Sequence, residues 1–233
     1  MADNSLSTPN PSRLLSYVIA SDDGLAPNIN GGVCTLSVCK PVMRRIATPG
    51  QDMVLGFSSR WHGEHRLIYA MFVDDKIPFD DYFQNPDFKA KKPTADNPYG
   101  DNFYRPTPCG QSHYVENENA AHFNKRAKII SQSSAPFSLV SNRFWYFGDN
   151  APNVPFCVLK DTNIAIPGQS RRAHRVTDDL MKIDAFMSWL SRHPMGVHGT
   201  PRDLTPGNAT KKSAFKAQQA RVRATLKTQQ KTP

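Results

Sequence analysis

The chain has 233 residues, of which 39% are hydrophobic and 10% aromatic, so it can bury a core and is not wholly disordered. No apolar run approaches the roughly 18 residues that a membrane-spanning helix needs, and the N-terminus lacks the apolar core of a secretory signal. The sequence therefore predicts a soluble cytoplasmic protein with no membrane partner.

Charge is distributed unevenly along the chain. It carries 29 basic and 20 acidic side chains, a formal net charge of +9, but residues 205–233 hold seven basic side chains and no acidic one. The preceding residues are therefore nearly neutral. A basic extension of this kind either attracts nucleic acid or another anionic surface, or only keeps the protein soluble. Its basic residues are Lys211, Lys212, Lys216, Arg221, Arg223, Lys227 and Lys231.

The four cysteines, Cys34, Cys39, Cys109 and Cys157, are expected to be free thiols, because the chain has no secretory signal. Structural zinc is the alternative. Cys34 and Cys39 lie five residues apart, however, and a zinc knuckle needs a spacing of two intervening residues. We expect neither a metal ion nor a cofactor.

The first half of the chain is rich in strand signals. Alternating apolar residues, Gly and Pro punctuation and a Pro in the first turn of a short helix set the boundaries. In chain order we expect a disordered leader at 1–12, a strand at 14–19, a long loop, a strand at 34–38, a helix at 40–47, and a hairpin of strands within 50–59 and 66–73.

The second half mixes helices, a long polar loop and further strands. We expect a short amphipathic helix within 77–88, a polar loop over 92–125, strands within 138–148, 156–160 and 163–167, and a helix at 178–192 capped by Thr177. A loop of that length inside a compact domain is often functional.

The order of these elements does not alternate strand with helix, which argues against a doubly wound sheet. We expect an α+β domain: a small curved β-barrel or half-barrel of mixed strands with flanking helices. It would span residues 13–204, between the disordered leader and the flexible basic tail at 205–233.

Several blocks of the sequence, in order, resemble the nucleotide modification associated (Nmad) domain family of bacterial and phage proteins. The resemblance implies a role linked to modified nucleobases or nucleotides. The segments GQDMVLGFSS and RLIYAMFV are also similar to the core hairpin of PUA-like domains, which include readers of modified bases. The blocks that carry the family resemblance are YVIASDDGLAPN, CTLSVCKPVMRR, GQDMVLGFSS, RLIYAMFV, FDDYF, GDNFY, SNRFWYFG and a later HR pair.

Residues 144–147, Phe-Trp-Tyr-Phe, are the densest aromatic cluster. In a strand, Phe144 and Tyr146 face one way and Trp145 and Phe147 the other, so one pair can pack the core while the other lines a base-stacking pocket. The alternative is that all four are core residues. Ser58 and Ser59, at an expected strand end, would hold a base edge beneath Trp61, unless they only form a turn.

Other polar residues complete the predicted site. GDNFY supplies a carboxylate, a carboxamide and a phenol suited to base amides or sugar hydroxyls, or else only an Asx turn. The ligand-binding set is Ser58, Ser59, Trp61, Asp101, Asn102, Tyr104, Ser141, Trp145, Tyr146 and His174. The phosphate-binding set, alternatively solvated surface, is Lys40, Arg44, Arg143, Arg175, Lys211 and Lys212.

Enzyme signatures are weak. The sequence has no Walker loop, GxSxG or HExxH motif. Asp87-Phe88-Lys89 is similar to the Asp-x-Lys motif of metal-dependent nucleases, but a chance match explains this short pattern better. His122 or His174 could act as a general base, but the sequence places no nucleophile beside either. We therefore expect binding of a nucleobase or nucleotide, free or in nucleic acid, within a DNA-modification or phage-defence system. A base-modifying enzyme and a protein-interaction subunit of such a system are the alternatives.

Overall fold

The computed structural model describes residues 10–59, 66–108, 113–115, 117–155, 157–158 and 174–204. Several predictions fall outside these ranges: most of the leader, the strand at 163–167, the basic tail with Lys211 and Lys212, and the residues Trp61 and Cys109. Of the strand expected at 156–160 only residues 157–158 are described, and they are helical. No helix in the described part of the chain is long and apolar enough to cross a membrane.

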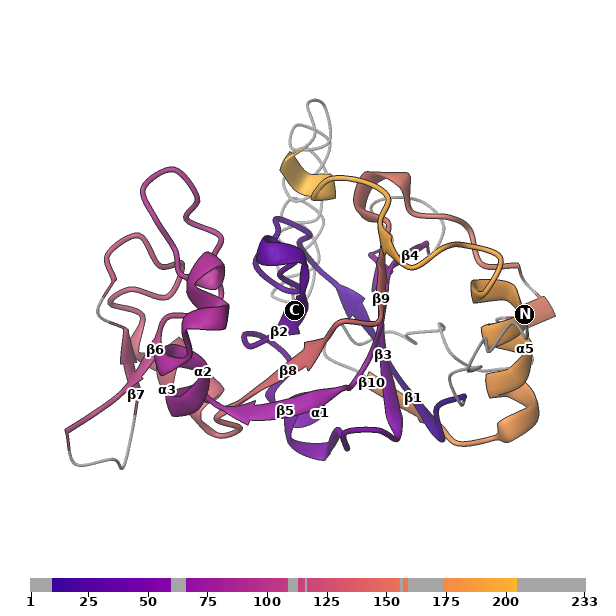
Figure 1. The fold of residues 1–233 in the computed structure, drawn as a ribbon, viewed down its shortest axis with the longest axis horizontal. Coiled ribbons are helices and arrows are strands. Elements are labelled where there is room, and N and C mark those ends of the chain that lie inside the picture. Colours follow the sequence, from indigo (N-terminus) through magenta and orange to yellow (C-terminus); the bar gives the residue numbers. More distant parts are fainter. Residues whose placement is uncertain are drawn as a thin grey trace, which may run out of the picture.

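A six-stranded sheet forms the centre of the structure, in the order β10-β1-β3-β4-β9-β11 (Figure 1). Strands β1 and β3 pair in parallel, as do β9 and β11, whereas β4 is antiparallel to both of its neighbours. The strands are β1 (Arg13–Ile19), β3 (Asp52–Ser58), β4 (Leu67–Phe72), β9 (Phe144–Tyr146), β10 (His174–Thr177) and β11 (Gly196–Val197). As a result β1, β3, β9 and β11 all end at one edge of the sheet, which we call the carboxyl edge.

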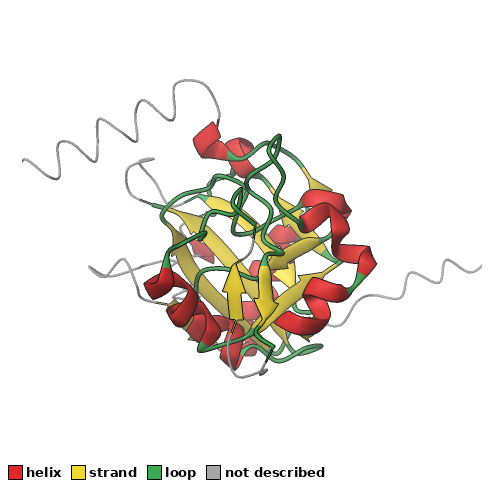
Figure 2. Ribbon diagram, turned by 90° about the vertical axis from the view of Figure 1, so that its left-hand side faces the viewer, coloured by secondary structure: helices red, strands yellow, loops and turns green. Residues whose placement is uncertain are grey.

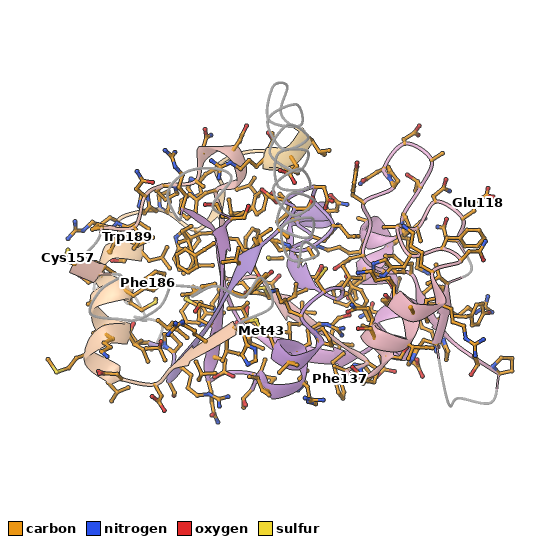
Figure 3. All side chains as sticks on the ribbon, turned by 180° about the vertical axis from the view of Figure 1, so that it is seen from behind. Met43, Glu118, Phe137, Cys157, Phe186 and Trp189 are labelled. Atoms are coloured by element: carbon orange, nitrogen blue, oxygen red, sulfur yellow. The ribbon has the colours of Figure 1, made fainter. Side chains whose placement is uncertain are left out.

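Helix α5 (Leu180–Leu190) packs on one face of this sheet. Its buried residues include Phe186 and Trp189, and the Trp145 indole Nε1 donates to the His193 carbonyl just beyond the helix at 2.8 Å. Figure 3 shows Phe186 and Trp189 on α5, at the end of the molecule opposite Glu118. The helix buries this face because apolar residues recur along it at helical spacing.

A three-stranded sheet, β2-β8-β5, packs on the opposite face. This small sheet lies near the centre of the molecule in Figure 1. It contacts the large sheet where the sulfur atoms of Cys34, on its first strand, and Met71, on β4, lie 3.7 Å apart. The strands are β2 (Cys34–Leu36), β5 (Asp75–Pro78) and β8 (Phe137–Ser141). Most of the buried apolar side chains form one cluster that includes residues of both sheets.

The remaining elements gather beyond the small sheet, at the end of the molecule away from α5 (Figures 1 and 2). The hairpin of β6 and β7 lies there with α2 and α3, while α1 precedes β3. These elements are α1 (Pro41–Ile46), α2 (Phe79–Gln84), α3 (Arg126–Ser133), β6 (Tyr104–Pro106) and β7 (His113–Val115); the 3-10 helices are η1 (Asn30–Gly32), η3 (Pro86–Lys91), η4 (Gly148–Asn150) and η5 (Arg202–Leu204).

The α+β class is confirmed, and so are the strand at 14–19, the helix near 40–47 and the β3–β4 hairpin. The closed barrel is wrong for the described residues, because the large sheet is open, with β10 and β11 as its edge strands. The expected strand at 138–148 is two strands in different sheets, since the chain turns at residues 142–143. Helix α5 is capped by Asp179, whose carboxylate accepts from Met181 N at 3.1 Å, and not by Thr177.

Candidate functional site

Three tyrosines lie side by side in one transverse row of the large sheet. Cross-strand pairing runs from Tyr17 to Gly56, then to Tyr69 and to Tyr146. Directly paired residues project on the same face of a sheet, and this face is the one turned toward β2. We call Tyr17, Gly56, Tyr69 and Tyr146 the tyrosine row.

Glycine at position 56 makes the row possible. A Cβ atom on Gly56 would lie 2.3 Å from Cε1 of Tyr69, which is far below any real contact distance. The Tyr69 ring therefore crosses over β3, and its hydroxyl lies 2.9 Å from the hydroxyl of Tyr17. Both rings are buried, so the pair forms a polar link inside an otherwise apolar layer.

Asp22 follows β1 at the carboxyl edge and is 3% exposed. Its carboxylate accepts from the Tyr146 hydroxyl at 2.8 Å and from the Arg202 backbone N–H at 3.0 Å. In return, Asp203 accepts from the Asp22 N–H at 3.1 Å and from the Ser21 hydroxyl at 2.7 Å. The loop after β1 and the 3-10 helix η5 are thus joined reciprocally through two carboxylates.

The environment of Asp22 changes its acidity. Burial raises the pKa of Asp22 to about 6, while the Arg202 N–H and the Tyr146 hydroxyl act in the opposite direction by stabilising the charged form. Burial and the Asp22 charge raise the pKa of Tyr146, which therefore stays a neutral donor. Around pH 6 Asp22 exists as both acid and carboxylate, so near that pH this position can donate or accept a hydrogen bond.

Cys39 and Lys40 form a strained turn beside the tyrosine row. Both have left-handed backbones, with φ of 64° and 45°. Non-glycine residues adopt this conformation at a cost of about 1–3 kcal/mol each, and such strain clusters at functional sites. The Lys40 ammonium lies 4.7 Å from the centroid of the Tyr17 ring. The Cys39 side chain is exposed, although surrounding protein atoms raise the pKa of its thiol.

Comparison with known proteins adds one finding. The model of the family described as nucleotide modification associated domain 2 matches residues 11–208. The chain belongs to this family. No curated protein and no solved structure gives a match. Membership in this nucleotide modification associated family links the chain to nucleotide-modification systems and confirms the family resemblance seen in its sequence.

Part of the predicted ligand-binding set lies near the tyrosine row of this nucleotide modification associated domain. Tyr146 belongs to the row, Ser58 ends β3 at the carboxyl edge, and His174 pairs with Tyr17 across β10 and β1. Ser58 N donates to the Arg66 carbonyl at 2.8 Å. The Ser59 hydroxyl is buried and has no hydrogen-bond partner within the described residues.

Asp101 and Asn102 lie away from the tyrosine row, in a buried polar cluster between β2 of the small sheet and α2. The Asp101 carboxylate accepts from the hydroxyls of Thr35, Ser37 and Tyr82, each at 2.8 Å. Asn102 Nδ2 donates to the Tyr82 carbonyl at 2.8 Å. These contacts tie the polar loop to β2 and α2, so the structure assigns the GDN motif an internal bonding role.

Tyr104 faces His122, not the tyrosine row. Its hydroxyl lies 2.6 Å from His122 Nδ1, and its ring stacks on Phe79 with centroids 4.7 Å apart. Burial, followed by the charges of Lys128 and Lys125, lowers the pKa of His122 to about 4. His122 is therefore neutral at pH 7 and suited to hold the Tyr104 hydroxyl.

Trp145 and Ser141 are not brought to the tyrosine row. Trp145 faces α5 and is 3% exposed, as the alternation within 144–147 predicts for a core residue. Ser141 precedes β9 and therefore lies toward the opposite edge, where its hydroxyl donates to Asp74 at 3.2 Å. Of the two predicted ligand-binding residues Trp145 and Tyr146, Tyr146 therefore faces the tyrosine row and Trp145 faces α5, because adjacent residues of a strand point to opposite faces.

The predicted phosphate contacts also separate in space. Arg44 is fully buried, and its guanidinium donates to the carbonyls of Cys39, Gln132, Ala135 and Phe137, so it is no surface phosphate ligand in this structure. Arg143 donates to the Asp74 carboxylate at 2.6 Å, toward the edge opposite the carboxyl edge. Arg175 is exposed on the edge strand β10. Lys40 is the described residue of this set whose side chain contacts the tyrosine row, through the Tyr17 ring; Lys211 and Lys212 lie outside the described residues.

The sequence interpretation missed Tyr17, Tyr69 and Asp22. A recognisable signal was present, because Tyr17 and Tyr69 each interrupt a strongly apolar strand and Gly56 interrupts the strand between them. Among the described residues, no group of three or more His, Cys, Asp or Glu side chains is placed to hold a metal ion.

Proposed function

We propose that the protein binds a nucleobase or nucleotide, free or in nucleic acid, at the carboxyl edge of the large sheet, where the buried tyrosine row meets Asp22, within a DNA-modification or phage-defence system. The observation that carries this proposal is the meeting of the Tyr146 hydroxyl and the Asp22 carboxyl at the carboxyl edge of the sheet. Base edges present both donors and acceptors, and a group that can do either suits their recognition.

Two further features support binding over a purely structural role. The strained turn at Cys39 and Lys40 lies beside the same row, and backbone strain persists where the fold holds it in place. Family membership independently points to nucleotide chemistry. A PUA-like reader of modified bases is the more specific form of the proposal, and the similarity of the β3–β4 segment to that superfamily supports it.

The test compares two matched hydroxyl deletions. Tyr146→Phe and Tyr82→Phe each remove a buried hydroxyl that donates to a buried aspartate at 2.8 Å, but only the first lies in the tyrosine row. Ligands are deoxynucleosides, their 5′-monophosphates and 12-residue oligonucleotides with unmodified, 5-methyl or 5-hydroxymethyl cytosine, measured by calorimetry and fluorescence anisotropy. We expect Tyr146→Phe to weaken binding about tenfold or more, as for a lost hydrogen bond to a charged group.

The control variant Tyr82→Phe should bind within about twofold of wild type, since it suffers a comparable loss of stability without touching the row. Equal effects of the two substitutions would refute the site. Conversion of the base, detected by mass spectrometry, would instead identify an enzyme. Absence of any nucleotide binding at low salt, together with tight association with another protein, would favour the interaction subunit.

A further inference from the structure

A second transverse row of residues closes the large sheet at the carboxyl edge. Ile19, at the end of β1, pairs with Ser58 at the end of β3. Ser58 N donates to the Arg66 carbonyl at 2.8 Å, and Arg66 N donates back to the Ser58 hydroxyl at 2.9 Å. Arg66 also forms a β-bridge with Asn153 on its other side. The backbone of Arg66 is therefore fixed between two strand partners, immediately before β4.

An irregularity in the pairing turns the Arg66 side chain toward the face of the tyrosine row. Gly56 pairs with Tyr69, but the next residue, Phe57, pairs with Leu67, so β4 holds one extra residue between them. Phe57 and Leu67 therefore project on the face opposite to Gly56 and Tyr69, and the residue before Leu67 returns to the tyrosine face. A β-bulge commonly re-aims a side chain in this way, and bulges are frequent next to active sites.

The Arg66 guanidinium has no hydrogen-bond or ion-pair partner among the described residues. Its Nε is buried and unbonded there, and the ion pairs of this part of the chain involve other cations. The Ser59 hydroxyl, at the same strand end, is buried and unbonded as well. Leaving a charged donor unsatisfied is costly, so such groups in a folded protein indicate a ligand or water. Arg66 is partly exposed, so an anion can reach it from solvent.

The charges around Arg66 leave this edge positive. Arg202 donates its backbone N–H to the Asp22 carboxylate at 3.0 Å, and Asp22 lies three residues beyond Ile19 of the second row. Burial, followed by the charge of Arg66, lowers the pKa of Arg202, while Asp22 and Asp149 act on Arg202 in the opposite direction. Both carboxylates thus bear on Arg202, and neither forms an ion pair with Arg66 in the described structure.

We propose that Arg66 binds the phosphate group of a nucleotide at the carboxyl edge, on the face where Tyr146 meets Asp22. This inference rests on the proposed function and specifies its ligand class: a phosphorylated nucleotide or a strand, not a free nucleoside. The guanidinium presents a planar fork of N–H donors that matches the oxygens of a phosphate. The contact is made at the partly exposed end of the sheet, so nothing has to enter the buried tyrosine row. The phosphate of a free nucleotide and the phosphodiester of a strand share this chemistry.

The experiment compares Arg66→Gln with the matched control Arg126→Gln. Arg126 is exposed at the start of α3, beyond the small sheet, so its loss changes the net charge equally without touching the carboxyl edge. The ligands are the deoxynucleosides named above, their 5′-monophosphates, the 12-residue single strands and inorganic pyrophosphate, all measured by calorimetry. Arg66→Gln should bind the monophosphates about tenfold more weakly and keep nucleoside affinity within about twofold of wild type. Arg126→Gln should keep every affinity within about twofold.

Thermal unfolding separates phosphate binding from a structural role. Because the Arg66 Nε makes no bond in the described structure, Arg66→Gln alone should not lower the melting temperature. Saturating monophosphate should raise the melting temperature of wild type and Arg126→Gln more than that of Arg66→Gln. Arg66→Lys retains the charge without the fork, so its monophosphate affinity should lie between those of wild type and Arg66→Gln.

Salt dependence distinguishes the two sources of phosphate. If Arg66 contacts a strand, Arg66→Gln should lower the slope of log affinity against log salt by about 0.7, the value for one phosphate contact. A loss of monophosphate affinity with an unchanged strand slope would identify a free nucleotide as the ligand.

Four results would overturn the proposal. Unchanged binding of monophosphate, pyrophosphate and strand by Arg66→Gln would refute the phosphate site and leave the proposed function standing. Equal losses of nucleoside and monophosphate affinity, with a lower melting temperature, would show that Arg66 supports the fold. Binding of pyrophosphate by wild type through Arg66, without binding of any nucleoside, nucleotide or strand, would refute the proposed function and leave only an anion site. Absence of binding to all these ligands would refute both.

Discussion

Asp22 makes the stability of this protein depend on pH in a direction opposite to that of a salt-bridged aspartate. Burial raises its pKa from the ordinary 3.8 to about 6 in the folded state. The folded protein therefore binds the proton more tightly than the unfolded chain does. The resulting stabilisation is fully present below pH 3.8 and is lost as pH rises through about 6.

The size of the effect follows from the pKa difference. A shift of about two units, at about 1.4 kcal/mol per unit, corresponds to about 3 kcal/mol between pH 3.8 and pH 7. Asp22→Asn removes this titration while keeping the side-chain shape. The free energy of unfolding of the variant, relative to wild type, should therefore rise by about 3 kcal/mol across that range. For a domain of this size, this is roughly 6–12 °C in melting temperature.

Urea unfolding at intervals from pH 4 to pH 7.5, followed by tryptophan fluorescence, measures the difference. Groups that titrate in both proteins cancel in the comparison. Tyr146→Phe provides a directional check: loss of its hydroxyl bond to the carboxylate should raise the pKa of Asp22 further and move the transition to higher pH. Tyr82→Phe, at the separate Asp101 cluster, should leave the transition in place. A pH-independent difference between wild type and Asp22→Asn would refute this reasoning.

Three more substitutions or truncations test other parts of the structure. Trp145→Ala should lower the free energy of unfolding by about 3–5 kcal/mol, measured by denaturant titration, because it leaves a cavity against α5. The nucleotide affinity of the folded fraction, measured by calorimetry, should stay unchanged. Gly56→Ala should cost about 1–3 kcal/mol or more in the same titration, because the new methyl group meets the Tyr69 ring, and a neutral result would contradict the crossing of β3. Removal of residues 205–233 should flatten the salt dependence of oligonucleotide affinity without changing preference for a modified base; an unchanged slope would show that the tail only aids solubility.

Local patterns in the sequence determined several elements of this protein. Helical spacing of apolar residues predicted α5, and two apolar runs around a polar turn predicted the β3–β4 hairpin. Strand alternation predicted that Trp145 and Tyr146 face opposite sides, which the structure confirms. These features depend on neighbours within a few residues, so the chain's own periodicity specifies them.

The site was decided only by tertiary structure. The tyrosine row joins residues from β1, β3, β4 and β9, and its register depends on how separate strands pair, including the irregularity beside Gly56. Asp22 meets the backbone of Arg202, 180 positions along the chain. The same long-range packing placed the GDN motif and Arg44 in the interior, where their polar groups bond to the protein itself. No local pattern encodes such contacts, because each arises from burial and register set by the whole fold.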